Sequence, residues 1–409
     1  MPASKRLIAV FSGNRAEYGL LYPILRAIRE HSGLDYRLII SGAHLDSDFG
    51  QTKSEIRKDG FEIHAEVDLD MSGEGTSVTS QAIASGILGM SSVLHDLNPD
   101  VVVVYADRFE GFSAMIAATQ MNIPSAHIEG GDITEGGALD DSVRHAMTKL
   151  AHLHYTSNSQ ASNRVLAMGE DPWRVKTVGF TAIDLIMEGN FANAEELCQL
   201  LGLEHSRPVI LFTQHSVTTE FKEAVQQLRP SMESLCRIAN EDAQVILTYP
   251  NNDAGGKDIA ATLKEFTSEA QPNIQLHKSL GRYNYHGILA LARSREWRIV
   301  CVGNSSSGIK ETSVFGCPTV NIGSRQQGRL RSENVLDANY NAHEIYSAIQ
   351  RCLYDEEFRA RCAAASNPYG GGTAGQQVAD NLASVDLSQN VILRKRMTLT
   401  GESRNGWFR

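Results

Sequence analysis

The sequence contains no long apolar run and no cysteine motif. The apolar stretch near its start, residues 7–12, is too short for the core of a signal peptide. No stretch approaches the roughly 20 residues of a membrane-spanning helix. Six cysteines stand at positions 198, 236, 301, 317, 352 and 362 without a C-x-x-C pair. These absences predict a cytoplasmic protein with reduced thiols and no membrane partner.

Basic residues are outnumbered by acidic ones. The chain has 38 Lys and Arg against 48 Asp and Glu, a formal net charge of −10. Because nucleic-acid binding depends on neutralising phosphates, this balance argues against a nucleic-acid partner but allows a small basic pocket for one anionic ligand. With 42% hydrophobic and 21% charged residues over 409 positions, we expect a globular protein of two or three domains.

Short β-branched runs alternate with helical patterns along most of the chain. The unbroken valines of residues 100–105 suit a parallel strand that is buried on both faces. Such alternation predicts two doubly wound α/β domains with right-handed crossovers and an interdomain cleft as the natural ligand site. We expect a helix over 109–120 and strands over 6–11, 36–40, 100–105, 125–128, 175–178, 209–213, 245–249, 274–277, 299–302 and 319–322.

A helical, strand-poor segment near residues 179–202 separates two series of strands. We therefore expect a first Rossmann-like domain over 1–180 and a second over 181–368. A glycine-rich stretch then leads into a helical pattern over 369–385. Residues 386–409 form a tail without clear periodicity, and the sequence indicates no role for it.

Charged residues follow two strands of the first domain. Gly13 and Arg15 lie in a strand-to-helix turn, which suits either an anion site or an ordinary turn with a surface arginine. Asp107, Arg108 and Glu110 directly follow the valine run. Ligands of doubly wound sheets bind beyond the carboxyl ends of strands, so these side chains are candidates for chemistry. The alternative is that Asp107 caps the next helix.

A loop rich in glycine and carboxylates follows the strand at 125–128. Crowded carboxylates raise one another's pKa, which suits acid/base chemistry, although an exposed polar loop has the same composition. Asp140 or Asp141 could also cap the following helix. The spacing of the four nearby histidines matches no zinc signature, so we predict no metal site. The carboxylates are Glu129, Asp132, Glu135, Asp140 and Asp141, and the histidines are His127, His145, His152 and His154, of which the last two fit a strand entry.

Polar residues also follow the strands of the second domain. His215 comes after residues 209–213, where it is either functional or structural. Ser305, Ser306 and Gly308 join a strand to a helix, which suits a phosphate cradle or simple helix capping. Glu311 could accept hydrogen bonds from ribose hydroxyls, and Arg325 adds positive charge. Together the strand ends predict a site that binds a nucleotide-sugar and acts on its sugar by acid/base chemistry.

Several blocks, in this order, resemble one enzyme family: GNRAEY, DRFE, HIEGGD, DDSVRHAMTKLAH, QHSVTTE, YPNNDAG, GNSSSGIKE and GSRQQGR. The family is that of the hydrolysing UDP-N-acetylglucosamine 2-epimerases, whose close relatives act on nucleotide-linked diacetylbacillosamine. The resemblance implies a GT-B fold, with the helix over 369–385 crossing back to the first domain. It also implies a homodimer or homotetramer, no cofactor, and a UDP- or GDP-linked acetamido sugar as substrate for sialic or legionaminic acid synthesis.

The resemblance further implies a mechanism and its residues. A base removes the C2 proton, the nucleoside diphosphate leaves C1, and the glycal intermediate is rehydrated and reprotonated on the opposite face. The implied acid/base residues are Asp107, Glu129, Asp140 and His215. The implied nucleotide contacts are Arg15, Arg108, Ser305, Ser306, Gly308, Glu311 and Arg325.

Two departures bear on the substrate. Position 106 is Ala where the family commonly has Gly, and the loop between Glu129 and Asp140 is slightly longer than in the sialic-acid enzymes. The second departure favours a bacillosamine-type sugar as an alternative. A non-hydrolysing 2-epimerase, a GT-B glycosyltransferase and a non-catalytic nucleotide-sugar sensor are the competing functions.

Overall fold

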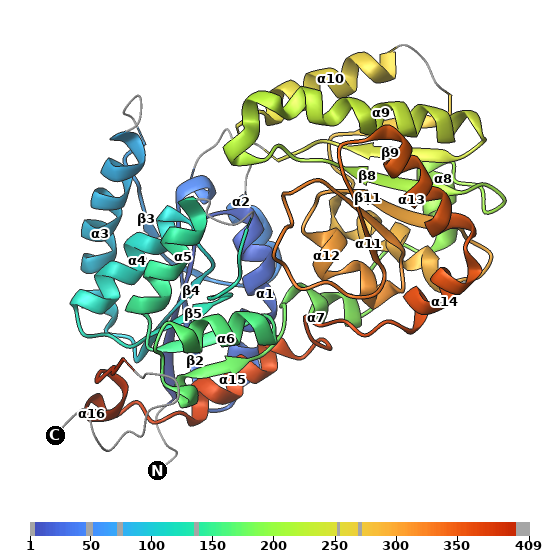
Figure 1. Ribbon diagram of the computed structural model, residues 1–409. Coiled ribbons are helices and arrows are strands. Elements are labelled where there is room, and N and C mark those ends of the chain that lie inside the picture. The colour runs from blue at the N-terminus through green and yellow to red at the C-terminus, as the bar shows by residue number, and fades with distance from the viewer. Residues whose placement is uncertain are drawn as a thin grey trace. The chain divides into compact units, whose positions relative to one another are not determined.

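The computed structural model describes residues 5–45, 52–71, 77–134, 139–251, 254–268 and 272–397 (Figure 1). Within these residues the chain divides into two compact units. The described residues up to 133, with 139–185 and 369–397, form the first unit. Thr134 and the described part of 186–368 form the second. The predicted pair of doubly wound α/β domains is therefore confirmed.

The first unit is built on a parallel sheet that has seven strands in the described residues, in the order β3-β2-β1-β4-β5-β6-β7. Alternate residues of β4 enter two different cores, because a strand covered on both faces buries every side chain. Val101 and Val103 pack into one core, whereas Val102 and Val104 pack into the other. The strands are β1 (Arg6–Ser12), β2 (Leu34–Ser41), β3 (Ile63–Val67), β4 (Val101–Tyr105), β5 (Ser125–Ile128), β6 (Leu153–Thr156) and β7 (Val175–Thr177).

Helices cover both faces of this sheet (Figure 1). Helices α1 and α15 contribute to one core, and α3 and α4 contribute to the other. The helices are α1 (Arg15–Glu30), α2 (Thr52–Lys58), α3 (Val78–Leu97), α4 (Phe109–Gln120), α5 (Leu139–Leu150), α6 (Ser159–Ala167), α15 (Ala374–Ser384) and α16 (Gln389–Ile392). Helix α7 (Ala182–Met187) begins in this unit, and its last two residues belong to the second.

The second unit repeats the arrangement, with a parallel sheet whose described strands follow the order β10-β9-β8-β11-β12-β13. Its strands are β8 (Val209–Thr213), β9 (Gln244–Thr248), β10 (Ile274–His277), β11 (Ile299–Gly303), β12 (Thr319–Ile322) and β13 (Val335–Ala338). Its helices are α8 (Ala194–Leu201), α9 (Ala224–Asn240), α10 (Gly256–Ser268), α11 (Gly281–Ala290), α12 (Ser307–Lys310), α13 (Ala342–Tyr354) and α14 (Glu356–Ala364).

After α14 the chain returns to the first unit, where α15 packs against α1. The approach is close, because a Cβ added to Gly375 would lie 2.5 Å from the backbone oxygen of Pro23. The carboxylate of Asp184 accepts the backbone N–H groups of Ala374 and Gly375 at 3.0 and 2.7 Å. These two amides begin α15 and would otherwise be unsatisfied, so Asp184 fixes where the returning helix starts.

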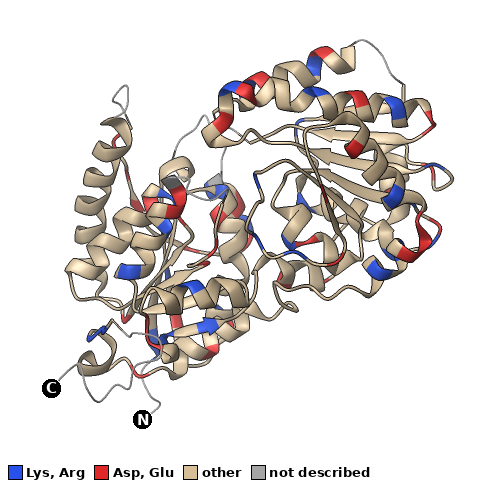
Figure 2. Ribbon diagram, viewed as in Figure 1, with Lys and Arg blue, Asp and Glu red and all other residues tan. Residues whose placement is uncertain are grey.

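The surface shows mixed charge, and the cysteines are unpaired. Acidic and basic residues are interspersed along the helices of both units (Figure 2). All six cysteines are free thiols. Among the described residues, no helix combines the length and apolar character needed to cross a bilayer.

Candidate functional sites at the strand ends

Each sheet reverses its strand order at one place, and the candidate residues gather there. In the first unit the reversal lies between β1 and β4, and in the second between β8 and β11. Loops that leave the two central strands diverge to opposite faces, which opens a crevice beyond their carboxyl ends. Each unit therefore has one candidate site, beyond the carboxyl ends of its central strands.

In the first unit, the turn after β4 presents Asp107. Ala106 has a φ of +53°, in the left-handed region that glycine occupies without strain. This conformation explains why a glycine would suit position 106. The N-cap of α4 is Arg108, with no capping side chain, so the carboxylate of Asp107 does not cap the helix. It instead pairs with the guanidinium of Arg144.

Arg144 lies on α5 and is almost completely buried. Besides Asp107, its guanidinium donates to Asp141 at 2.7 Å and to the backbone oxygen of Asp132 at 2.8 Å. A buried guanidinium needs such partners, and two carboxylates supply the compensating charge. Arg144 thus joins the turn after β4, the loop after β5 and the first turn of α5.

Asp140 and Asp141 lie in the first turn of α5, which begins at Leu139, so neither residue is the N-cap. Asp140 is exposed, whereas Asp141 is buried against Arg144. Asp141 thus joins Arg144 in one ion pair, and the assignment of Asp140 to acid/base chemistry stays a prediction. The charge of Asp140 reaches Arg108 and contributes to its raised pKa.

Glu129 follows β5 and is buried with a φ of +61°. Its backbone N–H donates to the carbonyl of Tyr155 at 2.9 Å, which holds the unusual turn in place. Burial and the nearby Glu129 carboxylate raise the pKa of Tyr105 well above its ordinary value. Glu129 is therefore close to the end of β4, as is Asp107, and the first-unit carboxylates converge on one edge of the sheet.

Arg108 lies beside a second group of carboxylates. Its guanidinium forms two 3.1 Å contacts to the buried carboxylate of Glu110. Burial lowers the pKa of Arg108, but Glu110, Glu17 and Asp140 outweigh it, so the pKa is raised overall. Arg108 remains half-exposed and can still meet an anion.

In the turn after β1, which the sequence offers as an anion site or as an ordinary turn, two backbone N–H groups already have acceptors. The backbone N–H of Gly13 donates to Glu17 at 2.7 Å, and that of Glu17 donates to the side chain of Asn14 at 3.0 Å. Burial and the charge of Glu110 raise the pKa of Glu17 to about 8. Arg15 pairs with Glu55 on α2, and both side chains are largely exposed. Among the described residues, Arg15 is therefore paired with Glu55 and not with Asp107.

In the second unit, His215 and Asn304 connect the two central loops. The backbone N–H of His215 donates to Oδ1 of Asn304 at 2.7 Å, and Nδ2 of Asn304 donates back to the His215 carbonyl at 2.9 Å. The backbone N–H of Asn251 donates to Nδ1 of His215 at 3.0 Å. The neutral ring therefore carries its hydrogen on Nε2. Burial and the charge of Arg325 lower the pKa of His215 to about 3.

The serines after β11 form a small hydroxyl cluster. Oγ of Ser305 lies 3.2 Å from Oγ of Ser307, which lies 2.6 Å from the hydroxyl of Tyr285. Ser306 is the N-cap of α12, but its side chain makes no capping bond. At Gly308 a Cβ would lie 3.3 Å from the side chain of Thr319, so a small residue lets α12 pack closely on the sheet.

Glu311 and Arg325 complete the second-unit set. Glu311 accepts from Nε2 of His286 at 2.9 Å if that nitrogen carries the hydrogen, and it stays partly exposed. Nη1 of Arg325 donates to the backbone oxygen of Asn304 at 3.1 Å, and Gln326 donates to the same oxygen at 2.8 Å. Asn304 therefore links His215 and Arg325, which are separated by 110 positions in the sequence.

Two central residues, Arg144 and Asn304, are absent from the sequence-based candidates. Both stand inside motifs that the sequence does single out, DDSVRH and GNSSSG. The signal for Arg144 is its spacing of three residues from Asp141, which places both on one face of a helix. Among the described residues, no group of three His, Cys, Asp or Glu side chains is arranged to hold a metal ion.

Comparisons with known proteins identify relatives of the whole chain. The sequence profile described as UDP-N-acetylglucosamine 2-epimerase matches residues 26–383. The GDP/UDP-N,N'-diacetylbacillosamine 2-epimerase (hydrolyzing) of Campylobacter jejuni is 32% identical, covering 87% of this chain and 89% of that protein. The UDP-N,N'-diacetylbacillosamine 2-epimerase (hydrolyzing) of Legionella pneumophila is 31% identical, covering 95% and 98%.

Solved structures share the fold. A putative UDP-N-acetylglucosamine 2-epimerase from Listeria monocytogenes has a TM-score of 0.75 at 19% identity, with 93% of this chain and 96% of that chain covered. The UDP-GlcNAc 2-epimerase of Neisseria meningitidis bound to UDP-GlcNAc has a TM-score of 0.70 at 17% identity, with 92% and 99% covered. The fold is thus GT-B-like.

Proposed function

The chain belongs to the UDP-N-acetylglucosamine 2-epimerase family, and from this premise we propose that it is a hydrolysing 2-epimerase of nucleotide-linked N,N'-diacetylbacillosamine. The observation that carries the proposal is the pair of relatives above 30% identity, both named for this substrate and both matched over most of their length. The slightly longer stretch of sequence between Glu129 and Asp140 supports the same choice, since the family resemblance counts both of these residues among the acid/base groups.

The proposed reaction has two stages. First, a base takes the C2 proton while the C1–O bond breaks, so that the nucleoside diphosphate leaves with the bonding electrons and a glycal remains. Water then adds its hydroxyl to C1, and a proton returns to C2 from the opposite face. The products are the free 2-epimer and the nucleoside diphosphate. Since no net electron transfer occurs, no redox cofactor is required.

We assign the proton transfers to Asp107, Glu129, Asp140 and His215. The ion pair with Arg144 holds the carboxylate of Asp107 in one orientation, which suits a group that must meet one carbon-bound proton. His215 is a different kind of group, because its neutral ring presents Nε2–H and can donate to a departing or adding oxygen.

We assign the nucleotide to the remaining candidates. Fixed positive charge and hydroxyl donors stabilise a departing diphosphate, and Arg325, Ser305, Ser306 and the close turn at Gly308 supply these features at one sheet edge. Glu311 would hold the ribose, and Arg108 and Arg15 would approach the diphosphate. Arg15 would first have to leave Glu55, and because that pair is exposed its loss costs little.

The proposal extends to the setting of the enzyme. The free 2-epimer would feed the synthesis of a nonulosonic acid of the sialic or legionaminic type in the cytoplasm. We propose an assembly of two or four chains, which light scattering with size-exclusion chromatography would test. A monomer at the concentration used for the activity assay would contradict the proposed assembly but not the proposed activity.

A substrate panel in deuterated water tests the activity. UDP- and GDP-linked N,N'-diacetylbacillosamine and UDP-N-acetylglucosamine are each incubated with the protein, and products are followed by NMR. The proposal predicts free sugar with inverted C2, deuterium at C2, and fastest turnover of a bacillosamine donor. Free sugar with C2 protium would contradict elimination. A deuterated sugar still attached to its nucleotide would indicate the non-hydrolysing reaction, and consumption only with an acceptor glycan would indicate a transferase.

A further inference from the structure

The last described residues of the chain fold onto the first unit. Ile392 of α16 is completely buried in the same core as α1 and α15. The guanidinium of Arg174, itself buried, donates to the backbone oxygens of Ile392 at 2.8 Å, Val391 at 3.0 Å and Arg394 at 3.3 Å. Three carbonyls of one short segment thus converge on one cation, which fixes the path of residues 391–394.

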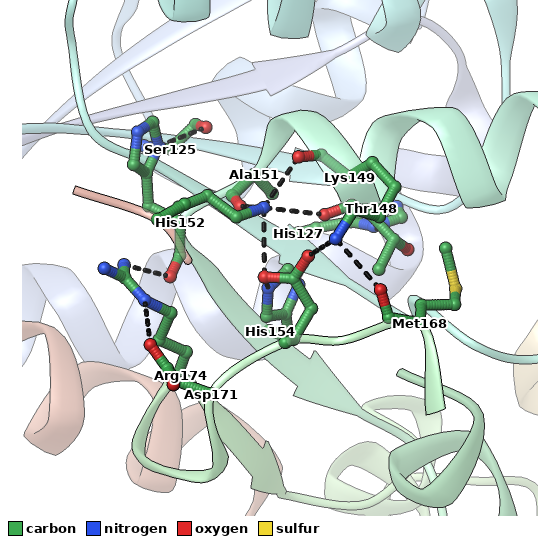
Figure 3. A network of polar contacts seen from close by, with 12 residues as sticks. Ser125, His127, Thr148, Lys149, Ala151, His152, His154, Met168, Asp171 and Arg174 are labelled. Atoms are coloured by element: carbon green, nitrogen blue, oxygen red, sulfur yellow. Dashed lines mark hydrogen bonds and ion pairs between the residues drawn. The ribbon is translucent and has the colours of Figure 1, made fainter. Parts of the chain in front are cut away.

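This anchorage brings Lys395 to the end of α5. Its Nζ donates to the backbone oxygens of Ala151 at 2.5 Å and Lys149 at 2.6 Å, with Thr148 at 3.4 Å. Figure 3 shows these three residues gathered around one nitrogen. The last carbonyls of a helix have no partner within the helix and carry partial negative charge. Lys395 therefore supplies both hydrogen bonds and positive charge at the carboxyl end of α5.

A buried carboxylate, Glu170, secures Lys395 in that position. It lies 3.0 Å from Lys395, 2.6 Å from Lys149 and 3.0 Å from Nε2 of His154. Burial raises the pKa of Glu170, but His154, Lys395 and Lys149 outweigh it and lower the pKa to about 2. Burial lowers the pKa of Lys395 to about 8, which leaves it mostly protonated at neutral pH. Glu170 therefore links the tail to α5, because it pairs both with Lys395 and with Lys149 of that helix.

Two connections lead from this end of α5 to the proposed catalytic carboxylate. Along the helix, Arg144 lies one turn before Thr148, whose hydroxyl donates to the Arg144 carbonyl at 3.0 Å. Across the sheet, the ring of His127 contacts the Thr148 hydroxyl at 3.1 Å and the carbonyl of Ala106 at 2.6 Å. Ala106 precedes Asp107, and Arg144 pairs with Asp107 directly. Both connections thus start at the helix turn that Lys395 contacts.

We propose that Lys395 is a positioning residue that, held by Glu170, fixes the carboxyl end of α5 and thereby the placement of Arg144 on Asp107. The inference rests on the proposed function for its effect on turnover. Lys395 itself is not assigned any contact with substrate or with a transferred proton. It gives the tail, for which the sequence indicates no role, a part in preorganising the first-unit site.

The test compares Lys395→Met, Lys395→Arg and, as the matched control, Arg396→Met, which removes a neighbouring exposed cation. Hydrogen–deuterium exchange of peptides covering residues 139–150 and 101–109 is measured together with kcat and KM on the best nucleotide-sugar. We expect Lys395→Met to speed exchange in both peptides and to lower kcat at least tenfold, with KM changed less than threefold. Lys395→Arg should restore both, because it keeps the cation, and Arg396→Met should match the wild type.

Unchanged exchange and unchanged kcat in Lys395→Met would overturn the proposal, as would an equal loss in Arg396→Met. If Lys395→Met does not fold, as judged by circular dichroism, Glu170→Gln replaces it, with the same expected changes. If Lys395→Met exchanges faster but the wild type turns over no nucleotide-sugar, the proposed function is refuted. The faster exchange would still support the conclusion that Lys395 holds the end of α5.

Discussion

The side-chain amide of Asn304 forms two hydrogen bonds with the backbone of His215 at the carboxyl edge of the second sheet, accepting from its N–H and donating to its carbonyl. The backbone carbonyl of Asn304 accepts from Arg325 and Gln326, so one buried residue links two loops that come from distant parts of the chain. The first unit has an equivalent centre in Arg144. In both units a buried hydrogen-bonding residue, rather than the candidate acid or base, determines the geometry of the site.

Replacing Asn304 with alanine should therefore impair turnover more than it impairs folding. The His215 loop would lose two hydrogen bonds, and misplacing a catalytic group by about 1 Å can cost on the order of 100-fold in rate. The stability loss should be about 1–3 kcal/mol, the usual cost of unsatisfied buried groups. Steady-state kinetics and urea unfolding measure the two effects.

Asn321→Ala is the matched control for that experiment. Asn321 is also a buried asparagine of the second sheet, but its side chain donates to Asp337 at 2.7 Å. It should lose comparable stability and keep nearly full kcat. Equal kinetic losses in the two variants would mean that Asn304 has only a structural role.

Arg144→Met should be the most damaging single change in the first unit. It leaves Asp107 and Asp141 without their shared cation, and an uncompensated buried charge typically costs about 3–5 kcal/mol. We expect a lower thermal midpoint and loss of deuterium incorporation at C2. The double variant Arg144→Met with Asp141→Asn removes one of the orphaned charges, so it should regain part of the stability but not the activity. A double variant no more stable than the single one would contradict this account.

The sequence predicts several elements with the bounds that the structure shows. Strands 125–128, 209–213, 274–277 and 319–322 and the helix over 109–120 have the expected bounds. Strands β3, β6 and β13 are not among the expected ranges, although His152 and His154 are assigned to a strand entry. β3 lies at the edge of its sheet and has a half-exposed, alternating pattern, and β13 is another short edge strand that includes an aspartate. Edge position does not by itself explain the omissions, because β7 and β10 also lie at sheet edges and are anticipated, and β6 is an interior strand.

The sites are predicted in part, for a physical reason. Ligands of doubly wound sheets bind beyond the carboxyl ends of the strands, and this rule identifies Asp107, His215 and Ser305 as candidates. It needs only the topology, which places the ends of the central strands at one edge of the sheet. The rule does not identify Arg144, because a charged residue inside a helix is usually exposed. That Arg144 is buried becomes clear only from its ion pairs in the folded structure. Nor can the rule show that Gly13 donates to Glu17, which depends on a side chain folding back onto its own turn.

Gly303→Ala should destabilise the second unit strongly. Gly303 ends β11 with a φ of +129°, and a Cβ there would lie 1.9 Å from the backbone oxygen of Thr213. Strain and collision act together, so we expect a loss on the order of 3–5 kcal/mol. Gly371→Ala is the control, because its Cβ would meet nothing within 4 Å and the change should stay within about 0.5 kcal/mol. Calorimetry that finds the two variants equally stable would refute the close approach of β8 and β11.

Glu17 should make folding stability depend on pH near neutrality. Its pKa is raised from 4.5 to about 8, first by burial and then by the charge of Glu110, so the folded state holds a proton that the unfolded state has released. Stability should therefore fall as pH rises from about 5 to 8, by at most ~1.4 kcal/mol per pH unit. The neutral side chain of Glu17→Gln does not ionise in this range, so the variant's stability should change little between pH 5 and 8. At pH 5 its stability should be close to that of the wild type. Denaturant unfolding at pH 5, 6, 7 and 8 gives the comparison, and parallel profiles for the two proteins would show that Glu17 is ionised in the folded state throughout.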